Sequence, residues 1–247
     1  MTRILPFTLV VLCAAAFISH NVAAQSPSVD WSGLYIGGKA GGSWANFDFG
    51  NSTEVIQFAP PTTIPGFTQS DGSFLAGGQI GYNQQFGKLV VGFECDIDWA
   101  SHQVSKTQQT LTTAFLPPQP ATLTTKHSAE TDLMELVGPR LGFSWQGLLF
   151  YAHGGVAFAE VTARANDSLL SPPLLLPAAG SDSNTVVGWA AGGGLEWLIT
   201  QAVSVGADYR HVDFGSDNYN PVMSRIGFTE DQVMLRVNVH LNGLFGR

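Results

Sequence analysis

The sequence has little charge, and this scarcity argues against an ordinary soluble protein. Only 12% of its 247 residues are charged, about half of the roughly 25% that is usual in soluble domains. The few charges are unbalanced, since 11 lysines and arginines face 19 aspartates and glutamates, which gives a formal net charge of −8. Because nucleic acid is bound largely through lysine and arginine contacts to phosphate, we expect no nucleic-acid partner.

Cysteine and long apolar runs are scarce as well. The chain has two cysteines, too few for a disulfide framework, so the fold must hold without one. After residue 24, no stretch approaches the ~20 consecutive apolar residues of a membrane-spanning helix. Any membrane segments must therefore be strands, because a closed β-barrel is the other structure that satisfies its backbone hydrogen bonds in lipid.

The N-terminus has the three parts of a secretory signal peptide. Arg3 precedes an apolar stretch over residues 4–18, and small residues follow up to Ala24. This order of a basic residue, an apolar stretch and a small-residue exit is typical of a cleaved export signal. We predict a signal peptide over residues 1–24 and a single domain over residues 25–247.

Alternation of apolar and polar residues predicts eight strands, because neighbouring side chains of a strand point to opposite faces. The clearest segment sets Leu89, Val91, Phe93, Cys95, Ile97 and Trp99 against a face that carries Glu94, Asp96 and Asp98. Each of the other segments likewise has one nearly uncharged face. The eight segments are residues 33–44, 74–86, 89–100, 132–145, 148–158, 187–197, 203–210 and 232–241.

The connections between these segments alternate in length. Short links are expected at residues 87–88, 146–147 and 198–202, and long loops at 45–73, 101–131, 160–184 and 214–231. Short turns at one rim and long loops at the other are typical of outer-membrane barrels, whose termini lie in the periplasm. We therefore predict an all-β protein, an eight-stranded antiparallel up-and-down transmembrane β-barrel.

Tryptophan placement favours the barrel over a soluble β-sandwich, which would also alternate but would carry more charge on its solvated face. All six tryptophans lie at or near predicted strand ends, where aromatic girdles meet the two membrane interfaces. They are Trp31, Trp44, Trp99, Trp145, Trp189 and Trp197.

Charged residues on the polar parity are expected to meet inside the barrel. Glu94, Arg140, His153 and Asp208 each lie six residues from a short turn, so they should share one layer. An eight-stranded barrel is only wide enough for its own side chains, which predicts a plug of ion pairs and hydrogen bonds in place of a pore. The predicted lumen network comprises Lys39, Glu94, Asp96, Asp98, Arg140, His153, Glu196, Asp208, Arg210 and Arg236.

Chemical roles for the polar residues are alternatives to this structural one. The three carboxylates of residues 94–98 could act in acid-base chemistry or bind a divalent ion, but a charged lumen places residues two apart on one face in any case. His102, His127 and His211 could bind haem or metal, although their spacing matches no ligand signature. His127 with Ser128, or His211 with Asp213, could belong to a hydrolytic site, but no nucleophile motif supports this. We expect no catalytic, cofactor-binding or metal site.

Several motifs resemble the porin-like outer-membrane immunogenic proteins of α-proteobacteria, which have a small barrel of the OmpA type. They span nearly the whole chain after residue 24. The matching stretches are Trp31-Ser-Gly-Leu-Tyr-Ile-Gly-Gly, Val90-Val-Gly-Phe-Glu-Cys-Asp-Ile-Asp-Trp-Ala, Arg140-Leu-Gly-Phe, Tyr151-Ala-His-Gly-Gly-Val-Ala, Gly188-Trp-Ala-Ala-Gly-Gly-Gly-Leu-Glu and Tyr209-Arg-His-Val-Asp-Phe-Gly.

The resemblance implies a surface-exposed structural or antigenic barrel, with haem binding in some relatives and no catalytic residues to carry over. Two departures stand out. The family usually ends on an aromatic residue that the assembly machinery reads, whereas here Gly246 and Arg247 follow Phe245. The position of Gly138 is commonly basic in relatives, which implies a thinner network in this chain.

We therefore expect a bacterial outer-membrane protein, and not an enzyme, that supports envelope integrity and surface contacts. The alternatives are a haem- or small-ligand-binding surface receptor and a narrow diffusion channel. Expected partners are outer-membrane lipids and lipopolysaccharide, the barrel-assembly machinery through the C-terminal strand, and extracellular ligands at the loops. No cofactor is expected.

Overall fold

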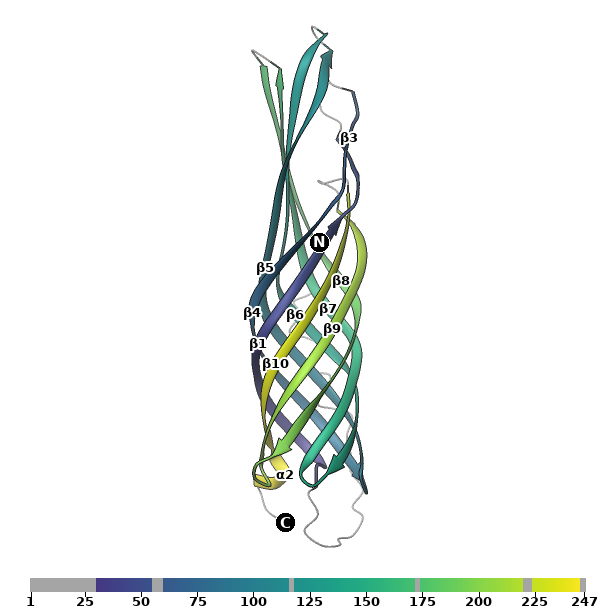
Figure 1. Ribbon diagram of the computed structural model, residues 1–247, viewed down its shortest axis with the longest axis vertical. Coiled ribbons are helices and arrows are strands. Elements are labelled where there is room, and N and C mark those ends of the chain that lie inside the picture. Colours follow the sequence, from purple (N-terminus) through teal and green to yellow (C-terminus); the bar gives the residue numbers. More distant parts are fainter. Residues whose placement is uncertain (1–29, 55–59, 116–117, 172–173, 220–223, 245–247) are drawn as a thin grey trace, which may run out of the picture.

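The computed structural model describes residues 30–54, 60–115, 118–171, 174–219 and 224–244. Eight long antiparallel strands close into a barrel in the order β1-β10-β9-β8-β7-β6-β5-β4 (Figure 1), and a separate two-stranded sheet pairs β2 with β3. The predicted all-β class and the eight-stranded up-and-down order are therefore confirmed. The predicted signal peptide and Phe245 lie outside the described residues.

The elements follow one another along the chain without a crossover in the barrel. Their bounds are β1 Gly33–Phe49, β2 Ser52–Glu54, β3 Thr62–Ile64, β4 Phe67–Phe86, β5 Leu89–Phe115, β6 Pro118–Trp145, β7 Leu148–Ser171, β8 Leu174–Leu198, β9 Val203–Tyr219, β10 Ser224–His240 and α2 Leu241–Leu244. The one helix of the described residues has four residues, and no described helix is long and apolar enough to cross a membrane.

Three short links join the strands at one end of the barrel, which we call the turn rim. They lie between β4 and β5, β6 and β7, and β8 and β9. Gly87, Gln146 and Gly147 have φ values of 64°, 51° and 86°, the left-handed backbone that tight hairpin turns require. The Asn242 side chain donates to the Ser32 carbonyl at 3.0 Å, so both ends of the described barrel also lie at this rim.

The prediction of long loops is wrong over most of its length, because the strands continue through those residues. The β5–β6 register runs to Phe115↔Pro118, and the β7–β8 register runs to Ser171↔Leu174. The pairing between β4 and β5 stops earlier, at Leu75↔Ala100. Beyond the barrel, residues 101–115, 118–131, 160–171 and 174–188 of β5 to β8 therefore form an open four-stranded sheet (Figure 1), which we call the projecting sheet.

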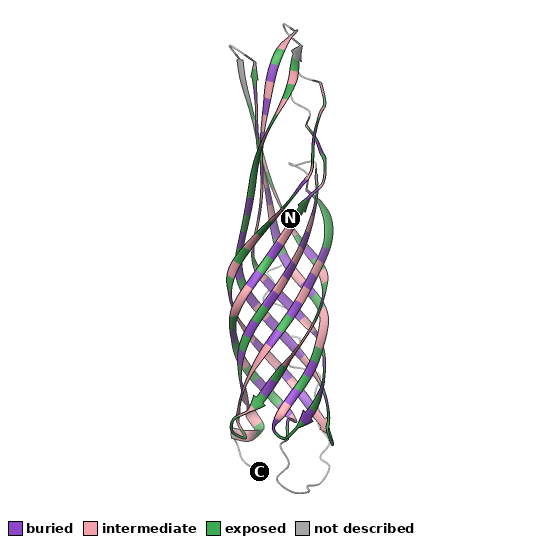
Figure 2. Cartoon of the chain, in the orientation of Figure 1, coloured by how far each residue is buried: buried purple, intermediate pink, exposed green. Residues whose placement is uncertain are grey.

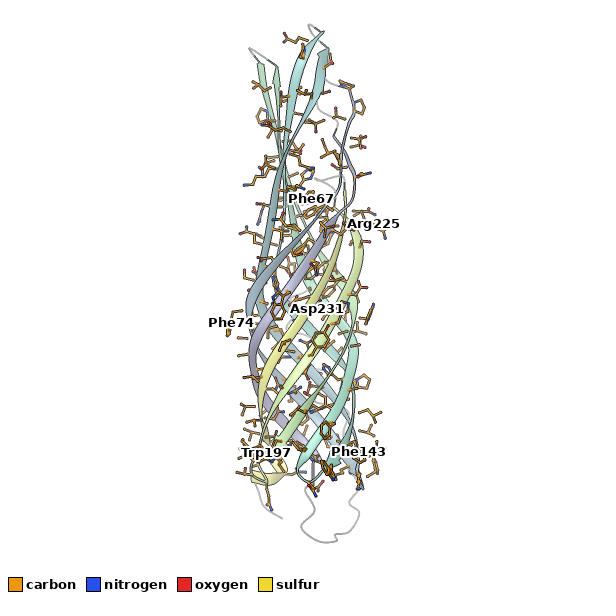
Figure 3. All side chains as sticks on the ribbon, viewed as in Figure 1. Phe67, Phe74, Phe143, Trp197, Arg225 and Asp231 are labelled. Atoms are coloured by element: carbon orange, nitrogen blue, oxygen red, sulfur yellow. The ribbon has the colours of Figure 1, made fainter. Side chains whose placement is uncertain are left out.

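From the turn rim to the middle of the molecule, the barrel is apolar outside and polar inside. Alternation of burial along each strand is visible in Figure 2, and the outward positions carry exposed aromatic and aliphatic side chains. Phe143 and Trp197 lie at the turn rim and Phe74 lies higher on the outer surface (Figure 3), where Phe74 is 71% exposed. A surface of this kind is suited to hydrocarbon and not to water.

Farther from the turn rim than this apolar outer surface, the polarity of the two faces is reversed. The side chains of each strand still alternate between the inside and the outside. On β1 the inward positions change from Lys39 and Ser43 to Phe47 and Phe49, all of them buried. Phe47 and Phe214 each stack on Phe228, at centroid distances of 4.8 and 5.0 Å; we call these three residues the phenylalanine core. The outward positions become polar, as in the pair Ser70 and Asn46, which are hydrogen-bonded at 2.6 Å.

Five tryptophans occupy the predicted girdles, but Trp31 does not. Trp44, Trp99, Trp145, Trp189 and Trp197 are 51–54% exposed on the outer surface, whereas Trp31 is 0% exposed. Its indole N–H donates to Ser144 Oγ at 3.1 Å, and its ring meets His240 edge-on at 5.5 Å. Because Trp31 precedes the first residue of β1, it folds into the mouth of the barrel at the turn rim and closes it.

Candidate functional site

The ten residues of the predicted lumen network all lie on inward positions of the barrel. Consecutive inward positions of β5 carry Glu94, Asp96 and Asp98, which are 3%, 4% and 1% exposed. The other members come from β1, β6, β7, β8, β9 and β10, so every strand of the barrel except β4 contributes a charged or histidine side chain to the network. The structure brings all ten together in two adjoining groups.

Arg140 occupies the centre of the group nearer the turn rim. Its guanidinium donates to Glu196 and, at 3.0 Å, to the Tyr35 hydroxyl. A third contact reaches Glu94 Oε2 at 3.5 Å. The guanidinium carbon also lies 3.7 Å from the centre of the Tyr151 ring. Arg140 is thus held by carboxylates and aromatic faces from four other strands.

Arg236 joins the same group from β10. It donates to Glu94 and, at 3.1 Å, to the Tyr151 hydroxyl, and it lies 3.4 Å from Asp208 Oδ2. His153 Nε2 is 3.0 Å from the other oxygen of Asp208. Arg236 therefore links β10 to β5 and β9 through ionic contacts that are screened little by solvent, and to β7 through the Tyr151 hydroxyl.

The second group lies farther from the turn rim and contains the remaining two cations. Lys39 pairs with Asp96 and, at 2.9 Å, with Asp98. Arg210 pairs with Asp98 and lies 3.7 Å from Asp96, while its Nε donates to Gln232 at 3.0 Å. Each cation therefore shares two carboxylates with the other, which satisfies charges that would otherwise be costly to bury.

Sequence reasoning missed the neutral groups that complete the network. The missed residues are Tyr35, Gln79, Tyr151, Ser204, Gln232, Asn238 and His240. Tyr35 is hydrogen-bonded to Glu94, and Gln79 donates to Asn238 at 2.7 Å. The inward parity that identified the charged residues applies to these as well, so the parity alone could have found them.

Glycines facing the lumen leave the space that the network fills. A Cβ at Gly77 would lie 2.2 Å from Asp98 Oδ1, and one at Gly81 would lie 2.3 Å from the Tyr35 hydroxyl. At Gly138, a Cβ would meet the carbonyl oxygen of Gly154 at 1.9 Å. The basic side chain implied for relatives at the position of Gly138 therefore has no room on this backbone.

The three histidines considered for haem or metal do not form a common site. His102 and His127 are inward and buried, at 0% and 3% exposure. His211 lies on the outer surface with its Nδ1 at 2.8 Å from Asp231 Oδ1. No group of three histidine, cysteine or acidic residues that could hold a metal is found in the described part of the chain.

The His102 ring lies between Ser43 Oγ at 2.8 Å and Asp71 Oδ2 at 3.6 Å. A hydrolytic triad has the same arrangement of serine, histidine and aspartate. Ser43 and His102 are 1% and 0% exposed, so a substrate has no access to this serine. The cluster is therefore no hydrolytic site.

The outer surface of the projecting sheet carries its own ion pair. The Arg164 guanidinium donates to Glu130, with 43% and 29% of the two side chains exposed. This hydrogen bond from Arg164 lowers the pKa of Glu130 below its usual value. Polar contacts of this kind, above the tryptophans and outside the barrel, are those of a surface in water.

Comparison with known proteins gives a family and several relatives. The family described as "Outer membrane protein beta-barrel domain" matches residues 9–235. The "22 kDa outer membrane protein" of Rhizobium leguminosarum bv. viciae is 25% identical over 222 residues, covering 88% of this chain and 81% of the relative. The "31 kDa outer-membrane immunogenic protein" of Brucella melitensis biotype 1 is 27% identical, covering 97% of this chain and 95% of the relative.

Among solved structures, the Neisserial surface protein A is similar at 13% identity with a TM-score of 0.40, covering 85% of this chain and 98% of that one.

Proposed function

This chain belongs to the outer membrane protein β-barrel domain family, and we propose that it is a non-conducting anchor that holds the projecting sheet outside the bacterial cell. Its location is the outer membrane, and the expected resemblance to α-proteobacterial outer-membrane proteins is confirmed. The proposed role has two parts, support of the envelope and contact with the surroundings.

The filled interior is the observation that carries the proposal. Trp31 closes the mouth at the turn rim, the lumen network occupies the middle, and the phenylalanine core lies beyond it. A solute crossing the barrel would have to displace buried ion pairs, and separating one partner of such a pair typically costs ~3 to 5 kcal/mol. This supports an anchor over a diffusion channel.

Strand length supports the second part of the proposal. β5 has 27 residues, which at about 3.3 Å per residue and a tilt of ~40° rise roughly 70 Å. The apolar band of such barrels is only ~25 Å tall. Long strands that leave the membrane as a rigid sheet present a fixed surface, whereas loops would present a variable one.

Planar-bilayer recording of the purified full-length barrel tests the anchor. We expect no stable open state, because the network and the phenylalanine core both block the lumen. Arg140→Ala with Arg236→Ala is the comparison variant, and Lys126→Ala on the outer surface is the matched control. A steady wild-type conductance that rises with salt concentration would refute the proposal.

A deletion strain tests the envelope and contact roles. We expect the strain to become more sensitive to detergent and to bind less to an immobilised surface. The full chain should restore both properties. A variant in which residues 104–129 are replaced by a short turn should restore only detergent resistance, provided that the barrel still resists unfolding in cold detergent. Equal restoration of surface binding by this variant would contradict a contact role for the sheet.

We also propose that the projecting sheet is an antigen. The Brucella relative is named as immunogenic, and the sheet extends beyond the barrel. Antibodies raised against the folded protein should bind whole cells, and the replacement of residues 104–129 should remove most of that binding. Antibody binding that persists undiminished would place the exposed epitopes elsewhere.

Contacts with membrane components are further proposals. The apolar outer band would contact lipid and lipopolysaccharide, and β10 is the strand through which the assembly machinery would engage the chain. A lipopolysaccharide dependence of folding rate in vesicles tests the first, and crosslinking during assembly tests the second.

A haem receptor is less well supported, because His102 and His127 point inward and are buried. Haem titration of the purified barrel, repeated with both residues replaced by glutamine, separates this alternative. We expect no histidine-dependent change in the haem spectrum.

A further inference from the structure

The projecting sheet has two lateral edges along which its strands have no neighbour in the sheet. One edge is β5 beyond Leu75↔Ala100, where its pairing with β4 ends. The other edge is β8 on the far side of Trp189↔Asp213, where its pairing with β9 ends. An open edge is a template for another strand, and natural sheets usually protect such an edge with proline or charge.

The β8 edge has such protection and the β5 edge does not. Residues 174–188 of β8 include Pro177, which has no N–H to offer a partner strand. Residues 103–115 of β5 contain no proline, glycine or acidic residue and are rich in threonine and glutamine. Their one charge is on Lys106, whose ammonium lies over the Phe67 ring at 4.6 Å. The β5 edge is therefore open to pairing.

The odd-numbered residues of β5 present their backbone groups to this open edge. The Gln103 N–H donates to Asp71 Oδ2 on β4 at 3.0 Å, so it points away from β6. Backbone groups of successive residues in a strand point to alternate sides. The next odd-numbered residues, all of them exposed, are Ser105, Thr107, Gln109, Leu111 and Thr113. In the described part of the chain, no hydrogen bond to their backbone groups is found on this side.

The inner face of the projecting sheet is covered by the pair β2 and β3. Ile64 of β3 is buried with Leu123 and Leu169 of the sheet. The Gln108 side chain donates to the Pro65 carbonyl at 3.3 Å, and Gln108 is on the inward parity of β5. These contacts are made by inward side chains, so they leave the backbone edge of β5 free. An occupant of this edge is therefore added as a further strand of the sheet.

The edge is complementary to itself when two copies run antiparallel with Gln109 at the centre. Ser105 of each copy then lies opposite Thr113 of the other, and Thr107 lies opposite Leu111. The lysine of each copy faces a neutral threonine, so no like charges meet. Opposed residues exchange two hydrogen bonds, which gives roughly ten bonds over the five edge-facing residues. Leu111, which is 83% exposed, gains an apolar contact from the Thr107 methyl group.

We propose that the open edge of β5 pairs antiparallel with the same edge of a second copy held in a facing membrane, and so joins two cells. This inference rests on the proposed surface contact and names its partner. The projecting sheet leaves the barrel at the end opposite the turn rim (Figure 1), so copies in facing membranes run in opposite directions, as the pairing requires.

Copies within one membrane are excluded by the same geometry. Their β5 strands run in the same direction, so their edges would meet in parallel. At a strand spacing of ~4.8 Å, the two barrels would also overlap below the sheets, because β4 of each barrel lies on that side of β5.

Tethering of vesicles that carry the folded full-length protein tests the pairing. Two populations of dioleoylphosphatidylcholine vesicles carry different dyes, and co-diffusion of the dyes after mixing reports tethering. We expect protein-bearing vesicles to tether to one another and not to protein-free vesicles. Gln109→Pro removes both central N–H groups and should reduce tethering about tenfold, because each contact loses two ladder hydrogen bonds. Gln109→Ala keeps the N–H and should tether like the wild type.

Charge at the centre of the pairing tests whether the partner is a second copy. Gln109→Lys and Gln109→Glu each set like charges opposite one another, so vesicles of either variant alone should tether poorly. A mixture of the two variants should tether as well as the wild type. Both substitutions are at an exposed position, so they keep the test decisive where Gln109→Pro fails to fold.

Three results would overturn the proposal. They are an absence of wild-type tethering or its equal occurrence with protein-free vesicles, undiminished tethering by folded Gln109→Pro, and a charge mixture that tethers no better than its separate variants. The proposed surface contact is judged separately, by the deletion strain. Surface binding that the full chain restores, without any vesicle tethering, would retain that function and refute the second copy as its partner.

Discussion

At the scale of single residues, Arg140 shows how the interior is held together. It pairs with Glu196 and contacts Glu94, and it is 2% exposed. Replacing a buried ion pair by apolar residues is often tolerated, but removing one partner leaves the other charge buried without compensation. A substitution that removes one charged residue of this network should therefore destabilise the barrel more than the number of contacts made by that residue suggests.

Arg140→Met is expected to destabilise the barrel by ~3 to 5 kcal/mol, because it leaves Glu196 and Glu94 without their shared cation. The measurement is the temperature at which the folded form is lost in electrophoresis of unboiled and heated samples. Lys126→Met removes an exposed positive charge from the same strand and should leave that temperature nearly unchanged. An identical melting profile for Arg140→Met and the wild type would contradict the network.

The surface pair of Glu130 and Arg164 gives a prediction about pH. Because the hydrogen bond from Arg164 lowers the pKa of Glu130, the ionised pair contributes stability above the unfolded-state pKa, and this contribution is lost as the pH falls through the lower folded-state value. Arg164→Gln should raise the pKa of Glu130 toward the ordinary ~4.3. Carboxyl NMR titration measures this value, and an unchanged value would show that the pair does not form.

At the same scale, the sequence anticipated the inward charged residues, because parity alone assigns a side chain to a face. Lys39 and Arg210 come from strands far apart in sequence, and parity cannot show that they share Asp96 and Asp98. That pairing depends on strand stagger, which no short-range pattern encodes. The girdle prediction is wrong for Trp31 for a related reason, since Trp31 precedes β1 and the alternation of the strand does not determine where its side chain points.

At the scale of elements, the strands are longer than the sequence indicated. A search for an apolar outward face ends at Trp44 and Trp99, because the outward positions beyond them are polar. The inward positions turn apolar at the same height, as at Phe47. Alternation therefore continues with its faces exchanged, and a pattern that requires an apolar outward face predicts a loop where the strand in fact continues.

Phe228→Ala tests the phenylalanine core. Loss of a buried phenylalanine typically costs ~3 to 5 kcal/mol, and here the loss should loosen the upper end of β9 and β10 while the membrane part stays folded. Limited proteolysis of folded protein in vesicles should cut near residues 214–228 faster than in the wild type. Leu235→Ala, at a 70% exposed position of the same strand, should leave this cleavage unchanged.

At the scale of the whole molecule, the exchange of polarity marks where the membrane ends. Below it the outer surface suits hydrocarbon and above it the outer surface suits water, while the backbone hydrogen bonds continue across the boundary. The fold class, the strand count and the short-turn rim could be predicted from the sequence. The projecting sheet could not, because its β6–β7 pairing links residues 32 to 48 positions apart.

Cysteine labelling on whole cells tests this boundary, with Cys95 replaced by serine. Val91 and Ser105 both lie on the outward parity of β5, on opposite sides of the boundary. A membrane-impermeant maleimide should react with Ser105→Cys and not with Val91→Cys, although both thiols should react in denatured protein. Labelling of Val91→Cys in intact cells would contradict the orientation of the barrel.

The unbroken course of β5 to β8 from the membrane into the projecting sheet also has a mechanical consequence. A pull on the tip of the sheet along the strand direction loads many ladder hydrogen bonds at once, in shear, and the lipid-embedded barrel takes up the force. The same pull on a flexible loop would straighten it first and then peel its contacts one by one. A sheet built in this way resists extension and passes the load directly to the barrel.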